Sequence, residues 1–195
     1  MTNNNRLNQQ LAFLTEADKL KSTLRATKLC DGSRRENSGE HSWHIALYAM
    51  TLSEHANRPI EISRVIQMLL IHDLVEIDAG DVPVHADYDQ AEQLAKEQAA
   101  ADRIFGLLPD EQSAAFRALW DEFEAAESND AIFAKSIDRV QPVIANLETN
   151  GGTWPDFNVT PEQLETRVGV KVSRGAPAVW AILQDRIKAW FSITR

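Results

Sequence analysis

Residues 62–77 predict a helix that is apolar on nearly every side. Other elements must cover such a helix, so we expect it to lie at the centre of the fold. The apolar residues of this segment are Val65, Ile66, Met68, Leu69, Leu70, Ile71, Leu74 and Val75. A glycine and a proline within residues 80–83 end the predicted helix.

Helical periodicity also runs through most of the remaining sequence. Apolar residues at helical spacing predict further helices over residues 7–24, 38–55, 89–107, 110–127, 131–148 and 176–191. Pro161 fits the first turn of a short additional helix, whereas Pro142 falls inside a helix and could kink it. Residues 168–172 alternate only weakly, and no stronger strand pattern is present. We therefore predict an all-α fold in a single domain spanning residues 1–195.

The charge balance limits the partners that the chain can bind. The 195 residues include 20 basic and 29 acidic side chains, which give a net charge of −9. This field repels polyanions and argues against broad nucleic-acid binding, but a small phosphorylated ligand needs only one local positive site. The polar first residues do not resemble a signal peptide, and no apolar run approaches the ~20 residues of a membrane-spanning helix. We expect a cytoplasmic protein.

The apolar helix contains a conflict, because its apolar run leads directly into His72 and Asp73. Glu76 follows four residues after His72, a spacing that predicts one shared helix face. Ionisable groups on a buried helix are costly unless they are paired or bound to a metal ion. Imidazole and carboxylate are good ligands for a divalent ion. By itself, this dipeptide also fits a hydrogen-bonded histidine at a helix end beside solvated acids.

Two further residues favour the metal hypothesis. His41 opens the helix predicted over residues 38–55, and Asp138 lies mid-helix among apolar residues. An aspartate in that position has low helix propensity and no capping role. Asp138 therefore needs a partner or a ligand.

These residues, in this order, resemble the HD-domain metallophosphohydrolase superfamily. Residues 35–42 and 72–83 are similar to its 5′-deoxynucleotidase branch, which includes the bacterial YfbR-like enzymes, and the second segment carries the pattern H-D-x-x-E-x-x-x-G-D-x-P. The resemblance implies an HD-type helical bundle. Its metal-site core would span about residues 20–148, and a helical extension would span about residues 160–192.

The resemblance implies that one divalent ion is coordinated by His41, His72, Asp73 and Asp138. Its identity stays open among Mn, Co, Fe, Zn, Ni and Mg, because such ligands suit several of these ions. A divalent ion lowers the pKa of its bound water and neutralises the charge of a phosphate. Metal-assisted hydrolysis of a phosphate ester is therefore the chemistry that we expect.

Three more residues are candidates for substrate chemistry. Glu76 is suited to orient or deprotonate the water, the alternative being a supporting or surface carboxylate. Asp81 could protonate the leaving 5′ oxygen or hold the sugar 3′-hydroxyl, the alternative being a turn residue before a proline. Arg25 stands for the phosphate-binding arginine of the branch, although no tryptophan follows it, and the alternative is a solvated helix residue.

The leading hypothesis is a 5′-nucleotidase that releases phosphate from nucleoside 5′-monophosphates, with deoxynucleotides favoured. One alternative is a phosphodiesterase or pyrophosphohydrolase of a signalling nucleotide such as guanosine tetraphosphate. Another is a non-catalytic helical binding protein that keeps the metal for stability. The resemblance implies a homodimer, because the branch commonly forms one. The C-terminal helix, with Trp180, Trp190 and Phe191, is expected to pack either on its own core or on a partner subunit.

Overall fold

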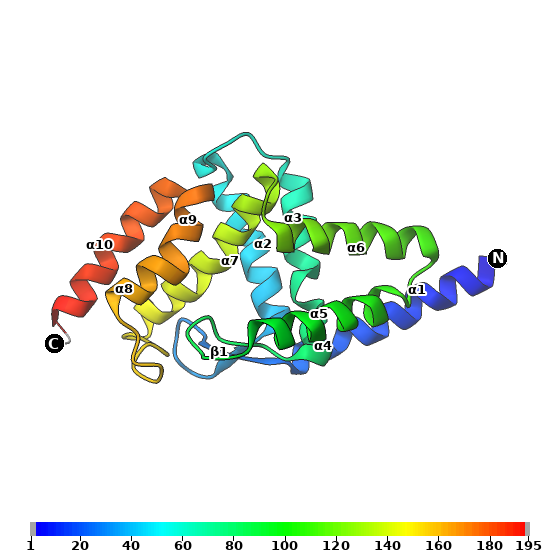
Figure 1. The fold of residues 1–195 in the computed structure, drawn as a ribbon, viewed down its shortest axis with the longest axis horizontal. Helices are drawn as coiled ribbons and strands as arrows, with labels where there is room; N and C mark the ends of the chain where they lie inside the picture. The colour runs from blue at the N-terminus through cyan, green and yellow to red at the C-terminus, as the bar shows by residue number, and fades with distance from the viewer. Residues whose placement is uncertain (1–2, 194–195) are drawn as a thin grey trace.

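The computed structural model describes residues 3–193, which form a helical bundle with one small hairpin (Figure 1). The helices are α1 Asn3–Ala17, α2 Ser38–Leu52, α3 Ile62–Ile71, α4 Glu76–Ala79, α5 Gln90–Phe105, α6 Asp110–Ala125, α7 Asn129–Glu148, α8 Pro161–Leu164, α9 Val170–Gly175 and α10 Pro177–Ile193. Short 3-10 turns cover Asp18–Ser22, Ser53–His55 and His72–Val75, and the π-helical turn Glu165–Gly169 joins α8 to α9. The predicted all-α class is confirmed.

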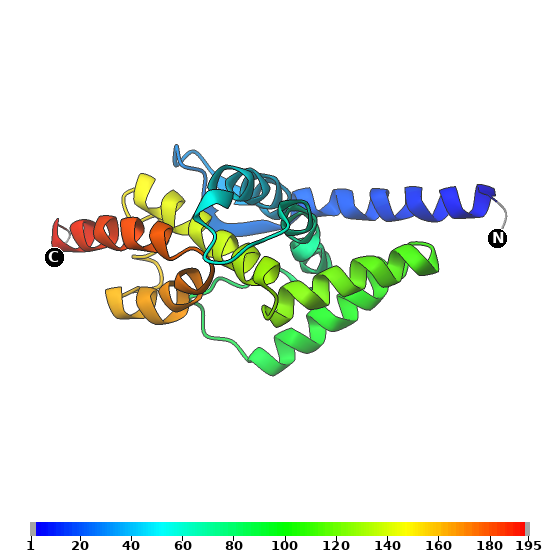
Figure 2. The ribbon, with the colours of Figure 1, turned by 90° about the horizontal axis from the view of Figure 1, so that it is seen from above.

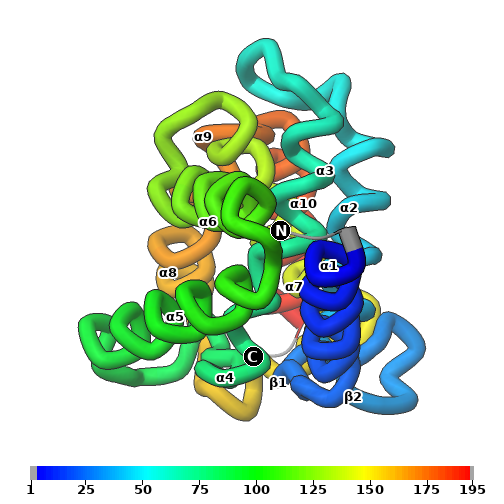
Figure 3. The backbone as a smooth tube through the Cα atoms, turned by 90° about the vertical axis from the view of Figure 1, so that its right-hand side faces the viewer, coloured from blue at the N-terminus to red at the C-terminus, as the bar shows by residue number. Residues whose placement is uncertain are grey.

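The bundle is elongated, with α1 extending at one end and α10 lying at the other (Figure 2). Viewed from the α1 end, α7 lies in the middle of the molecule, with α2 and α3 on one side and α5 and α6 on another (Figure 3). Helix α7 packs against α2, α3, α6, α9 and α10, so it is the element that the others share. No helix within residues 3–193 is long and apolar enough to cross a membrane.

The central segment 62–77 is helical as predicted, but it is not one continuous helix. Helix α3 ends at Ile71, and residues 72–75 tighten into a 3-10 turn before α4 begins at Glu76. The cause is local, because the ring of His72 hydrogen-bonds to the carbonyl of Leu69 at 2.9 Å. That contact competes with the ordinary helical hydrogen bond at the same carbonyl. His72 and Asp73 therefore lie in this turn and not on a continuous α-helix.

A hairpin that the periodicity did not predict precedes α2. Strand β1, Leu24–Lys28, pairs antiparallel with β2, Arg35–Asn37, although Leu24 was expected to continue the first helix. The strands are joined by a turn in which Asp31 accepts a hydrogen bond from the amide of Ser33. Gly32 adopts φ +72°, which glycine tolerates without strain. Conversely, residues 168–172, considered for a weak strand, are helical.

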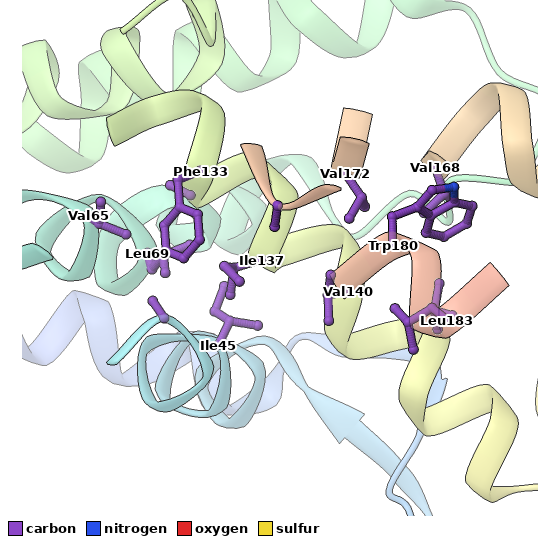
Figure 4. Packing of buried hydrophobic residues seen from close by; sticks show 14 of the residues in the cluster. Ile45, Val65, Leu69, Phe133, Ile137, Val140, Val168, Val172, Trp180 and Leu183 are labelled. Carbon is purple, nitrogen blue, oxygen red and sulfur yellow. The ribbon is translucent and has the colours of Figure 1, made fainter. Parts of the chain in front are cut away.

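The larger hydrophobic core lies where α7 meets α2, α3, α9 and α10 (Figure 4). Labelled members of this core are Ile45, Val65, Leu69, Phe133, Ile137, Val140, Val168, Val172, Trp180 and Leu183. A second cluster fills the space between α1, α5, α6 and the 72–75 turn, where Phe13, Leu74, Val75, Phe105 and Trp120 are buried. Leu74 and Val75 of the turn belong to this second cluster, and the ring of His72 lies 4.7 Å from the ring of Phe123 in the first, so the turn packs against both.

Replacing Ile137 with alanine is expected to destabilise the fold by about 2–5 kcal/mol, because the side chain is fully buried and its loss leaves a cavity. Chemical denaturation followed by circular dichroism measures the change in the free energy of unfolding. Ile182→Ala is the matched control, since Ile182 is 66% exposed on α10. Equal effects of the two substitutions would contradict this description of the core.

The C-terminal helix packs on its own core. Trp180 is buried, and the rings of Trp190 and Phe191 lie 5.2 Å and 5.8 Å from the ring of Trp154. Exposed apolar side chains lie on one face of α1 at Leu7, Leu11 and Leu14, on α2 at Trp43, Leu47 and Met50, and on α10 at Ile182 and Ile193. Leu7, Leu11 and Leu14 are spaced three or four residues apart, so they share one face of α1, and that face is exposed in this chain.

Candidate metal centre

Ionisable side chains from three elements converge at the 72–75 turn. His41 from α2, together with His72 and Asp73 from the turn, offers ligand atoms that all lie within 4.8 Å of one another. Asp138 from α7 joins them, with its Oδ1 atom 3.0 Å from Nε2 of His41 and 3.7 Å from Nε2 of His72. All four side chains are buried. The four residues selected from the sequence therefore occupy one small volume.

The ring of His72 is oriented as a metal-ligating ring would be. Its Nδ1 atom donates to the Leu69 carbonyl, so Nε2 is the nitrogen that faces the carboxylates and can bind a metal ion when it is deprotonated. Nε2 is buried 2.9 Å from Oδ1 of Asp73 but has no partner in hydrogen-bonding geometry. A buried ring nitrogen that lies close to a carboxylate oxygen, without a hydrogen bond between them, is the arrangement that a shared cation would satisfy. The residues present fit a divalent ion.

His41 is oriented by a second buried network. Its Nδ1 atom lies 3.1 Å from Oε1 of Gln141, and Nε2 of Gln141 donates to Glu36 at 3.0 Å. The amide oxygen of Gln141 can only accept, so Nδ1 of His41 donates to it, and Nε2 of His41 is the nitrogen that faces Oδ1 of Asp138. His41, Glu36 and Gln141 are almost completely inaccessible to solvent.

The start of α2 explains why His41 is fixed. Asn37 caps the helix, because its side chain accepts from the amide of Glu40 at 2.9 Å and the Glu40 side chain accepts in return from the amide of Asn37. Arg34 adds a bidentate contact to Glu40 at 2.6 and 2.8 Å. The cap holds the first turn of α2, and His41 follows directly after it.

Asp138 lies in the middle of α7, as the sequence predicted. Pro142 stands four residues later and has no amide hydrogen, so the carbonyl of Asp138 lacks its usual helical donor. The helix nevertheless continues through Pro142 to Glu148. Burial alone would raise the pKa of Asp138, but the positive charge of Arg139 and contacts with His41 and His72 lower it well below its ordinary value. Asp138 is therefore a carboxylate under ordinary conditions.

The field at this cluster is strongly negative. Burial would lower the pKa of His72, but the carboxylates of Asp73 and Asp138 outweigh it and raise that pKa to about 10. Burial likewise opposes ionisation of Asp73, and the positive charges of His72 and Arg25 lower its pKa instead. A field that holds a proton this firmly also attracts a divalent cation, which competes with protons for the same lone pairs.

Arg25 lies on β1 among four carboxylates and is not a solvated helix residue. Its NH1 group donates to Asp73 at 2.9 Å and lies 3.5–3.6 Å from Asp81 and Glu76, while its Nε is 3.6 Å from Glu36. The side chain is 12% exposed. Burial opposes its charge, yet the surrounding carboxylates raise its pKa above the ordinary arginine value. Arg25 therefore stays charged and holds Asp73 in place.

Glu76 and Asp81 both lie near the NH1 group of Arg25, at 3.6 and 3.5 Å. Glu76 accepts a hydrogen bond from the hydroxyl of Ser38 at 2.6 Å, so one of its oxygens is fixed. Burial and then the negative charge of Asp73 raise the pKa of Glu76 well above the ordinary glutamate value. Burial also raises the pKa of Asp81, against the opposing charge of Arg25. Asp81 follows Gly80, whose φ of +75° turns the chain at the end of α4.

A cavity of about 370 Å³ opens onto this cluster. Its lining includes Arg25, His72, Asp73, Glu76, Asp81 and Asp138. A smaller cavity of about 60 Å³ adjoins it and is lined by Arg25 and Asp81 together with His85, Trp154 and Phe157. The larger cavity falls in the range of volumes that small-molecule sites occupy, and the ligand cluster forms part of its wall.

Sequence reasoning missed three residues that support the cluster, Glu36, Ser38 and Gln141. The first two belong to the segment that resembled the 5′-deoxynucleotidase branch, but they were not assigned a role. Gln141 lies three residues after Asp138 on α7, and this helical spacing is the signal that could have found it.

Replacing Gln141 with leucine is expected to weaken divalent-metal binding by about 10- to 100-fold, because the partner that orients His41 is lost. Isothermal titration of Mn²⁺ into metal-stripped protein measures the dissociation constant. Gln184→Leu is the control, since Gln184 contacts Glu165 away from the cluster. An unchanged dissociation constant in the Gln141 variant would show that this network does not support the site.

Comparison with known proteins gives the family. A family model described as HD domain matches residues 17–180 of this chain. The chain belongs to the HD domain family. In fold, this HD domain protein is similar to the crystal structure of a predicted metal-dependent phosphohydrolase from Magnetospirillum magnetotacticum MS-1, with a TM-score of 0.92 and 45% sequence identity. That likeness covers 98% of this chain and 96% of the other.

More distant relatives carry an activity in their names. The human 5′-deoxynucleotidase HDDC2 is 26% identical over 64% of this chain, and the bovine protein of that name is 27% identical over 63%. The matched regions cover 62% and 60% of those two proteins, which is less than two thirds of their lengths. The 5′-deoxynucleotidase Ent638_2835 of Enterobacter sp. (strain 638) is 27% identical over 68% of this chain and 70% of its own length.

Proposed function

We propose that this HD domain protein is a divalent-metal-dependent phosphohydrolase. The metal ligands are His41, His72, Asp73 and Asp138. The observation that carries the proposal is the buried Nε2 atom of His72, which has no hydrogen-bond partner although carboxylate oxygens of Asp73 and Asp138 lie 2.9 and 3.7 Å away. The relative from Magnetospirillum, described as a predicted metal-dependent phosphohydrolase, supports the same assignment.

When bound, a divalent ion supplies an activated water and neutralises the charge of the substrate phosphate. Glu76 serves as the group that orients or deprotonates the attacking water, and Ser38 holds its carboxylate by the 2.6 Å hydrogen bond. Asp81 lines the cavity and serves as the group that protonates the leaving 5′ oxygen or binds the sugar 3′-hydroxyl. Arg25 steadies Asp73 and presents its guanidinium to the phosphate.

We propose nucleoside 5′-monophosphates, with deoxynucleotides preferred, as substrates. The names of the human, bovine and Enterobacter relatives support this choice, and the cavity volume suits a small phosphorylated molecule. A pyrophosphohydrolase of a signalling nucleotide is the second candidate. It is favoured by the basic residues that also line the cavity, Lys135, Arg139, Lys171 and Arg174.

The test is a substrate panel with metal-stripped and metal-reconstituted protein. The panel contains nucleoside 5′-monophosphates, 3′-monophosphates, triphosphates and guanosine tetraphosphate, and released phosphate and pyrophosphate are measured. Metal-dependent phosphate release from the 5′-monophosphates is expected. Release of pyrophosphate alone would move the protein to the second candidate. No turnover of any substrate by protein with bound metal would contradict phosphohydrolase activity.

We also propose a homodimer whose interface uses the exposed apolar faces of α1 and α2. Leu11 and Leu14 on α1 and Trp43 and Met50 on α2 are each more than half exposed, which is unusual for apolar side chains in this number. Multi-angle light scattering is expected to give twice the mass of one chain. Replacing Leu11 and Trp43 with serine and glutamine should shift the mass to that of a monomer, whereas a wild-type monomer would contradict the proposal.

A further inference from the structure

The guanidinium of Arg25 is contacted by carboxylates at two of its nitrogen atoms. Its NH1 group contacts three carboxylates that line the larger cavity, those of Asp73, Glu76 and Asp81. Its Nε atom lies 3.6 Å from Oε1 of Glu36. Glu36 is 1% exposed and lines neither of the two cavities that residues 3–193 form at the site. Any effect of Glu36 on a ligand in these cavities therefore passes through another side chain.

The two atoms that face each other in this contact are both unpaired. Within residues 3–193, neither the Nε atom of Arg25 nor the Oε1 atom of Glu36 has a hydrogen-bond partner, although both atoms are buried. One atom is a donor and the other is an acceptor, and buried polar atoms in proteins are nearly always paired. An approach from 3.6 Å to the usual ~2.9 Å would pair both atoms at once. Each atom is thus available to the other.

The hairpin and α7 together place the Glu36 carboxylate beside Arg25. Leu24 on β1 pairs with Asn37 on β2, Arg25 follows Leu24, and Glu36 precedes Asn37. The other carboxylate oxygen of Glu36 accepts a hydrogen bond from Nε2 of Gln141 on α7 at 3.0 Å. The hairpin therefore brings the two side chains together, and the bond from α7 fixes the carboxylate.

In the proposed function, Asp73 cannot hold Arg25 alone. Asp73 is a proposed metal ligand, and a bound cation competes with Arg25 for its negative charge. Glu36 is not a member of the cluster of ligand atoms that lie within 4.8 Å of one another. Its Oε1 atom lies 3.5 Å from Nδ1 of His41, but that nitrogen donates to Gln141. The charge of Glu36 therefore stays available to Arg25 when the metal site is filled.

We propose that Glu36 is a positioning residue for phosphate binding. Its carboxylate holds the Nε atom of Arg25, which leaves the NH1 edge of the guanidinium to face the substrate phosphate in the larger cavity. An arginine whose plane is already fixed loses less side-chain freedom when it binds two phosphate oxygens. This inference rests on the proposed function for the position of the phosphate and for the role of Arg25.

A double-mutant cycle between Glu36 and Arg25 tests the inference. Isothermal titration calorimetry measures the binding of inorganic phosphate to the Mn²⁺-loaded full chain as wild type, Glu36→Gln, Arg25→Gln and the double variant. Glu36→Gln is expected to weaken phosphate binding about tenfold, because the amide keeps the size of the side chain and still accepts from Gln141 but lacks the charge. In the Arg25→Gln background, the same substitution should change the dissociation constant less than about twofold.

Two controls separate this role from other effects of the substitution. Glu148→Gln removes a surface carboxylate that pairs with Arg186, and it should leave phosphate binding unchanged. Titration of Mn²⁺ into metal-stripped Glu36→Gln should give a dissociation constant within about threefold of the wild type, and a larger loss would assign Glu36 to the support of His41 and overturn the inference. If circular dichroism shows that Glu36→Gln does not fold, Glu36→Asp replaces it in the cycle, because the shorter side chain keeps the charge but withdraws it from Nε.

Turnover of nucleoside 5′-monophosphates gives a second readout. KM should rise about tenfold in Glu36→Gln while kcat changes little, and a fall in kcat at unchanged KM would overturn the positioning role. Equal losses of phosphate binding in the two backgrounds of the cycle, or no loss in either, would overturn it even if 5′-monophosphates are hydrolysed. A loss that depends on Arg25, without turnover of any substrate, would support the positioning role and contradict the proposed function.

Discussion

Replacing His72 with alanine is expected to reduce the affinity for a divalent metal more than 100-fold. Loss of a residue that only supports a ligand costs up to roughly 100-fold, and this substitution removes a ligand itself. Phosphate release should fall to background in the same variant. Two independent readouts apply, the metal content after dialysis and the stabilisation of the fold by added metal. An ion at 100 times its dissociation constant should stabilise the wild-type chain by about 2.7 kcal/mol, and this gain should vanish in the variant.

The control is His55→Ala, since His55 is exposed in the 3-10 turn after α2 and touches none of the four proposed ligands. Circular dichroism verifies that the His72 variant remains helical. A folded His72→Ala protein that binds metal like the wild type would show that this residue is not a ligand. Asp138→Ala provides the same test from α7, on the opposite side of the cluster.

Replacing Glu76 with glutamine is expected to lower kcat by about 10²- to 10⁴-fold while metal content stays unchanged. The amide preserves the size of the side chain and can still accept the hydrogen bond from Ser38, but it cannot take a proton from water. Initial rates of phosphate release with metal-saturated protein measure the effect. KM should change little, since the substitution removes an interaction of the transition state.

Glu92→Gln serves as the matched control, because Glu92 pairs with Lys96 on the exposed face of α5. Loss of metal in the Glu76 variant would assign Glu76 to metal binding. A variant with full kcat would exclude Glu76 as the residue that activates water.

The helices and the proposed ligands could be predicted from the sequence because each leaves a local signal. His72 and Asp73 interrupt an apolar run, and Asp138 stands in the middle of a helix where an aspartate is unfavourable. Such conflicts are visible without the fold, since burial is already implied by periodicity. The structure brings these residues together, and the substitutions described above test the roles assigned to them.

The remaining features depend on contacts between distant segments. The strands of the β1–β2 hairpin are short, and most of their residues also favour helices. The sequence therefore shows no alternation of apolar and polar residues that would predict the strands. Arg25 was predicted to lie on a helix, whereas in the structure it lies on β1, next to the carboxylates of Glu36, Asp73, Glu76 and Asp81. Glu36 and Gln141 are 105 residues apart, and their hydrogen bond becomes apparent only when the hairpin is folded against α7.

The central claim is that His41, His72, Asp73 and Asp138 bind one divalent ion at the base of the cavity. Anomalous X-ray scattering from crystals grown with Mn²⁺ tests it most directly, because the ion is located independently of any activity. We predict a single strong anomalous peak within bonding distance of Nε2 of both histidines and of a carboxylate oxygen from each aspartate. A cluster without a peak, or a peak bound by other residues, would contradict the account.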